Sequence, residues 1–177
     1  MPIIKTIIIL IIYSFCCINI YNEQNIKKEK IFIETPLINI KKQEIEEPIG
    51  NIYINKININ KPLYNINSKH NNIEENITIL PGTIEPNQEN SIIFLAAHSG
   101  PGDIAFFNDL DKLTINDEIV LTYNNIKYLY IVKDIWETSK DGNIEVIKEN
   151  TNQLILTTCS KTSNTKQLII NCIKIES

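Results

Sequence analysis

The chain has 177 residues, which is enough for one ordinary domain with an N-terminal extension. Its formal net charge is −4 and no basic stripe runs along it, so we expect no nucleic-acid partner. All 17 basic residues are lysines, which excludes any chemistry that requires a guanidinium group.

An apolar segment near the N-terminus, residues 7–20, follows a short head that carries Lys5. With its flanks it occupies residues 1–21, close to the roughly 20 residues that a helix needs to cross a bilayer, and Lys5 can snorkel to the interface. A cleaved secretory signal is the alternative, although no small-residue cleavage pattern is present. Lysines on both sides leave the orientation undecided by charge. We expect a signal anchor with the remaining chain outside the cell membrane, because that remaining chain resembles a compact extracellular domain.

Residues 22–48 are polar and rich in charge, which indicates a linker between the anchor and a domain. From residue 49 to residue 177 the pattern changes to short apolar–polar alternations, which are typical of β-strands. The predicted strands cover residues 50–54, 56–64, 91–97, 117–123, 127–133, 153–158 and 167–175. About eight short strands with few helices predict a mainly β domain, a closed or nearly closed barrel.

Three local signals refine this prediction. Pro81-Gly82 predicts a tight turn, because proline and glycine suit the two central positions of a type II turn. Asn124-Asn125 predicts a two-residue hairpin between two strands. The apolar spacing within residues 105–113 predicts a short helix, since Phe106, Leu110 and Leu113 would share one face.

Two predicted strands end in residues that can carry chemistry. His98 follows a continuous apolar run and precedes a glycine loop, and Cys159 ends another apolar strand. At a strand end, both side chains would emerge at a rim, where a scaffold holds reactive groups rigidly and leaves them accessible. A thiolate is a strong nucleophile, and an imidazole can protonate a leaving amine. Taken singly, a cysteine in a strand is usually a core residue and a histidine at a strand end a surface residue.

The other cysteines and the second histidine do not indicate a metal centre. Cys16 and Cys17 lie in the apolar segment, and the spacing of Cys159 and Cys172 fits no zinc site. Cys172 is expected to pack in the core. His70 lies in an Asn-rich segment and is expected to be a solvated loop residue.

No metal ion or other cofactor is expected from the sequence. The acidic residues that could form a calcium site are Glu74, Glu75, Asp103 and Asp109. Their spacing matches no EF-hand loop, so a calcium site is only the alternative to this expectation.

Four segments, in order along the chain, resemble motifs of the sortase family. They are ILPGT at residues 79–83, LAAHSG at 95–100, KLTINDEIVL at 112–121 and LILTTC at 154–159. The last is similar to the family's strand-ending TLxTC pattern, with Ile155 at the position of its first threonine. The resemblance runs from about residue 49 to the C-terminus.

The resemblance implies an eight-stranded sortase-type β-barrel with one or two short helices. Sortases are membrane-bound cysteine transpeptidases that cleave an LPxTG-like sorting signal between Thr and Gly and pass the acyl group to an amine. By position, Cys159 is the nucleophile and His98 the general acid/base, with Ala97, Ser99 and Thr158 as substrate contacts. The implied partners are secreted proteins that carry the signal and an amine acceptor, either a cell-wall precursor or a pilin lysine.

The third catalytic position departs from the family. Sortases carry an arginine at the start of the last strand, and the alignment of the following apolar residues places Gln167 there, with Lys166 beside it. Adjacent strand residues face opposite ways, so only one of the two can point at Cys159. We expect Gln167, whose neutral amide is a weaker donor than a guanidinium; Lys166 is the alternative.

Other interpretations of the same residues remain. A sortase-fold binding module with little or no turnover is the main one, because the family arginine is replaced. An L,D-transpeptidase would carry a glycine before its cysteine, and Thr158 stands there instead. A papain-like protease is also disfavoured, because its cysteine opens a helix.

Overall fold

The computed structural model describes residues 46–175. The predicted anchor at residues 1–21 and nearly all of the predicted linker at 22–48 lie outside the described residues. Within the described part, no helix has the length and apolar character that crossing a membrane requires.

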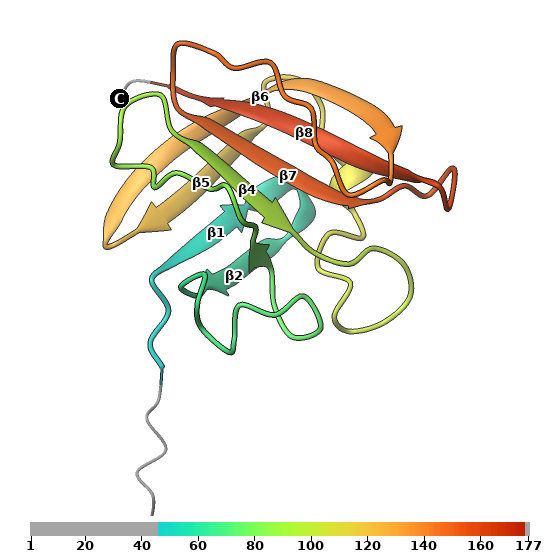
Figure 1. Cartoon of the computed structure of the whole chain (residues 1–177), viewed down its shortest axis with the longest axis horizontal. Coiled ribbons are helices and arrows are strands. Elements are labelled where there is room, and N and C mark those ends of the chain that lie inside the picture. Colours follow the sequence, from blue (N-terminus) through green and yellow to red (C-terminus); the bar gives the residue numbers. More distant parts are fainter. Residues whose placement is uncertain (1–45, 176–177) are drawn as a thin grey trace, which may run out of the picture. The chain divides into compact units, whose positions relative to one another are not determined.

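Eight strands and two 3₁₀ helices form a nearly closed barrel, which confirms the predicted fold class. The sheet order is β2-β1-β5-β6-β8-β7-β4-β3, with β2 and β3 at its edges (Figure 1). The elements are β1 (Gly50–Ile54), η1 (Asn55–Ile57), β2 (Ile59–Leu63), β3 (Thr78–Ile79), β4 (Ile92–Ala96), η2 (Leu110–Lys112), β5 (Glu118–Tyr123), β6 (Ile126–Ser139), β7 (Gln153–Cys159) and β8 (Lys166–Lys174).

Branched aliphatic side chains fill the barrel interior, as expected for strands that bury one face. Fully buried members of this core include Ile52, Ile54, Leu95, Leu121, Leu154, Leu156 and Ile170. Cys172 belongs to the same core and is 0% exposed, and burial raises the pKa of its thiol. The prediction that Cys172 packs in the core is therefore confirmed.

Both predicted turns are present. Asn124 and Asn125 join β5 to β6 with φ angles of 47° and 65°, the left-handed pair that a type I′ hairpin needs and that asparagine tolerates. At Pro81-Gly82 the Thr83 N–H donates to the Leu80 carbonyl at 3.4 Å, and Gly82 has a φ of 88°, as in a type II turn.

The predicted strand over residues 56–64 begins only at Ile59, after η1, and two further predictions differ more from the structure, each for a physical reason. β6 continues to Ser139 because a bulge between Val132 and Asp134 shifts its register and breaks the alternation of side chains. The helix predicted over residues 105–113 is reduced to η2. The Phe107 N–H donates to the His98 carbonyl at 3.0 Å, so this segment is tied to the end of β4 instead of continuing a helical ladder.

The outer face of β7 is covered by the connection between β6 and β7, residues 140–152. Leu154 and Leu156 face the core, so Ile155 faces outward, yet it is 0% exposed. Gln153 ties the connection down: its Nε2 donates to the Ile147 carbonyl at 3.0 Å, and its Oε1 accepts from the Glu149 N–H at 2.9 Å. Figure 1 shows the connection passing in front of β8 and β7.

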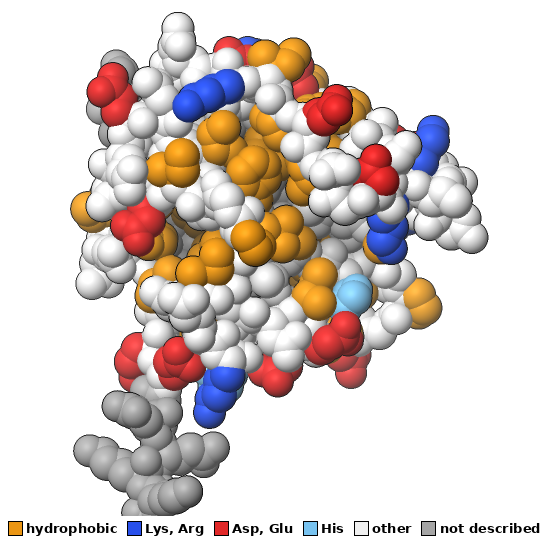
Figure 2. Space-filling model, viewed as in Figure 1, with side chains coloured by type: hydrophobic (Ala, Val, Ile, Leu, Met, Phe, Trp, Pro, Cys, Tyr) orange, Lys and Arg blue, Asp and Glu red, His pale blue; other side chains and the backbone are white. Residues whose placement is uncertain are grey.

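An apolar groove lies between this connection and the β3–β4 connection, residues 80–91. Figure 2 shows hydrophobic side chains gathered over the middle of this face. The groove is lined by Leu80, Pro81, Phe94, Gly142 and Ile144. A hollow of this kind, open and apolar, fits an extended chain.

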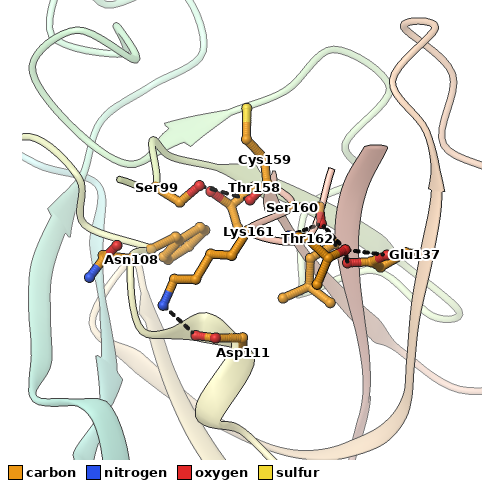
Figure 3. Close-up of a pocket in the computed structure, with 11 residues that line it drawn as sticks. Ser99, Asn108, Asp111, Glu137, Thr158, Cys159, Ser160, Lys161 and Thr162 are labelled. Carbon is orange, nitrogen blue, oxygen red and sulfur yellow. Dashed lines mark hydrogen bonds and ion pairs between the residues drawn. The ribbon is translucent and has the colours of Figure 1, made fainter. Parts of the chain in front are cut away.

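The turn after Cys159 is fastened to η2. The Lys161 ammonium lies 2.8 Å from the Asp111 carboxylate, beside a cavity of about 60 Å³ under the end of β7. Figure 3 shows the Cys159 sulfur pointing away from this ion pair. The cavity therefore lies beneath the backbone of Cys159, and the thiol faces the other side.

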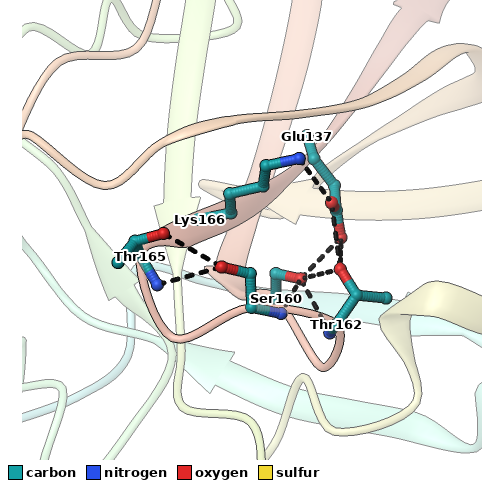
Figure 4. A network of polar contacts seen from close by, with 6 residues as sticks. Glu137, Ser160, Thr162, Thr165 and Lys166 are labelled. Carbon is teal, nitrogen blue, oxygen red and sulfur yellow. Dashed lines mark hydrogen bonds and ion pairs between the residues drawn. The ribbon is translucent and has the colours of Figure 1, made fainter.

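Glu137 on β6 fastens the same turn from the opposite side (Figure 4). Its carboxylate accepts hydrogen bonds from the Ser160 hydroxyl at 2.5 Å and from the Thr162 hydroxyl at 2.9 Å, and the Lys166 ammonium lies 3.7 Å away. The Ser160 hydroxyl, followed by that of Thr162, lowers the pKa of Glu137 below its ordinary value of 4.5. The turn after Cys159 is thus held by an ionised carboxylate.

We predict that Glu137→Gln lowers stability at neutral pH and that this difference disappears in acid. A carboxyl whose pKa is lowered by folding stabilises the native state above its unfolded pKa and stops doing so as pH falls through the folded value. The gap between the urea midpoints of wild type and variant should therefore close below about pH 4.5, the ordinary pKa.

Glu118→Gln on β5 is the matched control, because the Glu118 side chain makes no hydrogen bond or ion pair within residues 46–175. A gap between wild type and Glu137→Gln that stays constant from pH 7 to pH 3 would contradict the assigned role of the carboxylate.

Candidate active site

Two residues singled out from the sequence, Cys159 and Gln167, stand opposite each other on neighbouring strands, and a third, His98, follows the end of β4 by two residues. β4 runs parallel to β7 with Ala96 opposite Thr157, and β7 runs antiparallel to β8 with Cys159 opposite Gln167. Continuing the β4–β7 register by two residues places His98 beside Cys159. Opposed residues point to the same face, and neighbouring strands lie about 4.8 Å apart. His98, Cys159 and Gln167 therefore form a row on the outer face of the barrel.

Three hydrogen bonds fasten the ends of β4 and β7 to each other. The Ala97 N–H donates to the Thr157 carbonyl at 3.4 Å, and the Thr158 hydroxyl donates to the Ala97 carbonyl at 2.8 Å. The Ser99 hydroxyl donates to the Cys159 carbonyl at 2.7 Å. Ala97 and Thr158 are buried, and both residues join the strands; their contact with substrate stays a prediction.

The Cys159 thiol is partly exposed and has a cationic neighbour. The Lys140 ammonium lies 3.0 Å from the sulfur. Lys140 is the first residue after β6, at the start of the connection that covers β7. A cation at this distance can donate a hydrogen bond to the sulfur.

The His98 imidazole is bonded to a carboxylate. Its Nε2 lies 3.2 Å from Oε1 of Glu74, which comes from the β2–β3 connection. The imidazole is about one-third exposed and the carboxylate two-thirds, so the pair sits at the surface and its strength is reduced by solvent. Within the described part of the chain, no hydrogen bond joins the imidazole to the Cys159 thiol; each is bonded to a charged side chain instead.

Gln167 and Lys166 are both engaged by groups other than the Cys159 thiol. The Gln167 amide donates to the Asn143 carbonyl at 2.8 Å and to the Ser139 carbonyl at 3.3 Å, which uses both of its hydrogens. The Lys166 ammonium faces Glu137. In this arrangement neither side chain has a bond to the Cys159 sulfur, and the oxyanion role predicted for Gln167 stays a prediction.

Three of the four acidic residues considered for calcium have other partners. Glu74 is bonded to His98, the Glu75 carboxylate lies 3.4 Å from Nδ1 of His70, and Asp109 lies 2.8 Å from the Lys112 ammonium. Across residues 46–175, no three His, Cys, Asp or Glu side chains gather as metal ligands would.

Sequence reasoning missed Lys140 and gave Glu74 a different role. Lys140 precedes an Asp-Gly turn in a connection without periodicity, so its local sequence carries no signal. A signal did exist at the level of the whole chain: without arginine, any cation in the site must be a lysine. Only the strand order β6-β8-β7 shows which lysine reaches the end of β7.

Comparisons with known proteins show the family and the fold. The model of the sortase domain family matches residues 52–174, which include every strand except the beginning of β1. No curated protein sequence matches the chain.

Several solved structures share the fold. Sortase C1 from Streptococcus agalactiae aligns with 28% identity and a TM-score of 0.64 over 73% of this chain and 68% of its own. A lid mutant of sortase A from Corynebacterium diphtheriae aligns with 21% identity and a TM-score of 0.66 over 77% and 74%. Sortase C-1 from Actinomyces oris aligns with 21% identity and a TM-score of 0.63 over 74% of this chain and 76% of its own. The similarity to these last two structures concerns the fold alone. Because the family model covers more than half of the chain and both strand ends of the site, the protein belongs to the sortase family.

Proposed function

We propose that this protein is a sortase-type cysteine transpeptidase, with Cys159 as the nucleophile and His98 as the general acid/base. The observation that carries the proposal is the position of these two residues at the ends of adjacent parallel strands, β4 and β7, whose ends are bonded together. Such fastening fixes the spacing of two reactive groups at a rim, which is what covalent catalysis requires.

The reaction balances with these two groups. The Cys159 thiol gives up its proton, which His98 carries, and the sulfur attacks the carbonyl carbon of the scissile peptide bond. The electron pair moves to the carbonyl oxygen and returns as the carbon–nitrogen bond breaks, while the imidazolium protonates the leaving amine. An acceptor amine then loses a proton to His98 and attacks the thioester, which releases the thiolate.

The absence of a bond between thiol and imidazole is compatible with these roles. Hydrogen bonds between a nucleophile and its acid/base partner often form only when substrate is bound, and the acid then needs to reach the leaving nitrogen. Glu74 would orient the imidazole for this step.

The proposed substrate is an extended LPxTG-like sorting signal on a secreted protein. The groove lined by Leu80, Pro81, Phe94, Gly142 and Ile144 supports this choice because it is apolar and open, which suits an extended chain. The acceptor would be an amine of a cell-wall precursor or a pilin lysine, and residues 1–21 would anchor the enzyme in the cell membrane with its barrel outside.

One observation favours a second candidate, a sortase-fold binding module with little turnover. The position of the family arginine holds Gln167, whose amide is already occupied. Turnover separates the two candidates.

We predict that the full-length protein in detergent forms an acyl adduct on Cys159 with a library of LPxTG-like peptides, seen by mass spectrometry, and transfers it to an added amine. Cys159→Ala should form no adduct yet unfold at the wild-type urea concentration, because the thiol lies at the rim. Adduct formation on Cys159→Ala would exclude Cys159 as the nucleophile, and no adduct on folded wild type would favour the binding module.

We predict that His98→Gln slows acylation by a peptide amide about 10²-fold to 10⁴-fold, the usual contribution of a general acid. The loss should be much smaller for the corresponding ester, whose leaving alkoxide needs less help from an acid. Glu74→Gln should cause a smaller loss of the same kind.

Glu75→Gln, which affects the carboxylate beside His70, is the matched control and should behave as wild type. Equal losses for amide and ester substrates in His98→Gln would contradict the role of His98 as the acid for the leaving group.

A further inference from the structure

The site contains a positive charge where the family's arginine position does not provide one. We propose that Lys140, from the end of β6, is a catalytic residue that stabilises first the Cys159 thiolate and then the oxyanion of the tetrahedral intermediate. This inference rests on the proposed function, and its tests are chosen to fail separately from it.

The backbone around Lys140 is held in place by hydrogen bonds. The Lys140 N–H donates to the Thr165 carbonyl at 2.9 Å, which holds the residue against the turn after Cys159. The Gln167 amide bonds the carbonyls of Ser139 and Asn143, on both sides of Lys140 along the chain. Three hydrogen bonds therefore fix a short segment whose one long cationic side chain reaches the sulfur.

Gln167 acquires a positioning role in this arrangement. It is paired with Cys159 in the β7–β8 register, and its two donors secure the segment that carries Lys140. The residue at the family's arginine position thus holds a cation that comes from another strand.

The neighbouring lysines have acidic partners. Lys161 is paired with Asp111 at 2.8 Å, and Lys166 faces Glu137 at 3.7 Å. Lys140 has no ion pair within residues 46–175, and the polar contact of its side chain there is the sulfur at 3.0 Å. Its charge is therefore available to the reacting atoms.

The chemistry of the step suits a lysine at this place. During attack, negative charge moves from the sulfur to a carbonyl oxygen two bonds away, and a flexible ammonium with three donors can follow it. A lysine lacks the planar fork of arginine, so it supplies charge without bidentate orientation of the substrate.

The first test needs no substrate. Full-length protein is alkylated separately with anionic iodoacetate and neutral iodoacetamide, and the adduct on Cys159 is quantified by peptide mass spectrometry. The cation beside the sulfur should favour the anionic reagent, so Lys140→Gln should lower the iodoacetate-to-iodoacetamide rate ratio several-fold, and Lys140→Arg should keep it. Lys148→Gln removes an equal charge from the same connection, and should leave the ratio unchanged. An unchanged ratio in Lys140→Gln would overturn the placement of the ammonium at the sulfur.

The second test measures acylation of Cys159 by the peptide that acylates wild type. Lys140→Gln should slow acylation about 10²-fold, as the loss of an oxyanion donor does elsewhere. Lys140→Arg should recover part of the rate, and so should the double variant Lys140→Gln/Gln167→Arg, which restores an arginine at the family's position. Gln167→Ala should lose rate only while Lys140 is present, because it acts through that residue.

The outcomes separate this inference from the proposed function. Wild-type acylation that persists at full rate in Lys140→Gln would overturn the role of Lys140 and leave Cys159 as the nucleophile. A peptide acyl group found on Nζ of Lys140 would also overturn it, because Lys140 would then be an acceptor amine. If wild type forms no adduct at all, the proposed function fails, and the alkylation ratio still decides where the ammonium lies.

Discussion

The site depends on one constraint, the register shared by three neighbouring strands. β4 and β8 flank β7, one parallel and one antiparallel, and their pairing brings His98 and Gln167 to the level of Cys159. A shift of one residue in either pairing would turn a side chain to the other face of the sheet. The fully buried residues of β7, with core packing on one face and a covering connection on the other, make such a shift costly.

The polar groups around Cys159 divide into those that hold the backbone and those that face the reaction. The hydroxyls of Ser99 and Thr158 donate hydrogen bonds to carbonyl groups at the strand ends, and the Glu137 carboxylate accepts hydrogen bonds from hydroxyls of the next turn. None of these contacts involves the Cys159 thiol itself. Within residues 46–175, the polar contact of the thiol itself is with the Lys140 ammonium.

The sequence was sufficient for the parts that depend on local patterns. Alternation and turn residues located seven strands and the Asn124-Asn125 hairpin, and apolar runs that end in His98 and Cys159 placed both at a rim. β3 has two residues and is too short to leave a pattern, and the bulge after Val132 concealed the second half of β6. The site predicted from the sequence lacked Lys140. This residue reaches the sulfur through the path of a connection, which no local pattern encodes.

The position of Lys140 also explains how a chain without arginine can keep a cation at this site. β8 lies between β6 and β7, so a residue that leaves the end of β6 and turns over β8 arrives at the end of β7. A cation on β8 and a cation just after β6 can therefore both reach the end of β7, because β6 and β8 are adjacent strands. When the cation comes from the β6–β7 connection, the β8 position can hold a residue that fixes this connection. Gln167 suits that role, because its amide has two donors and no charge. The cation and the covering connection then form one unit, so the path of the connection and the position of the charge would change together.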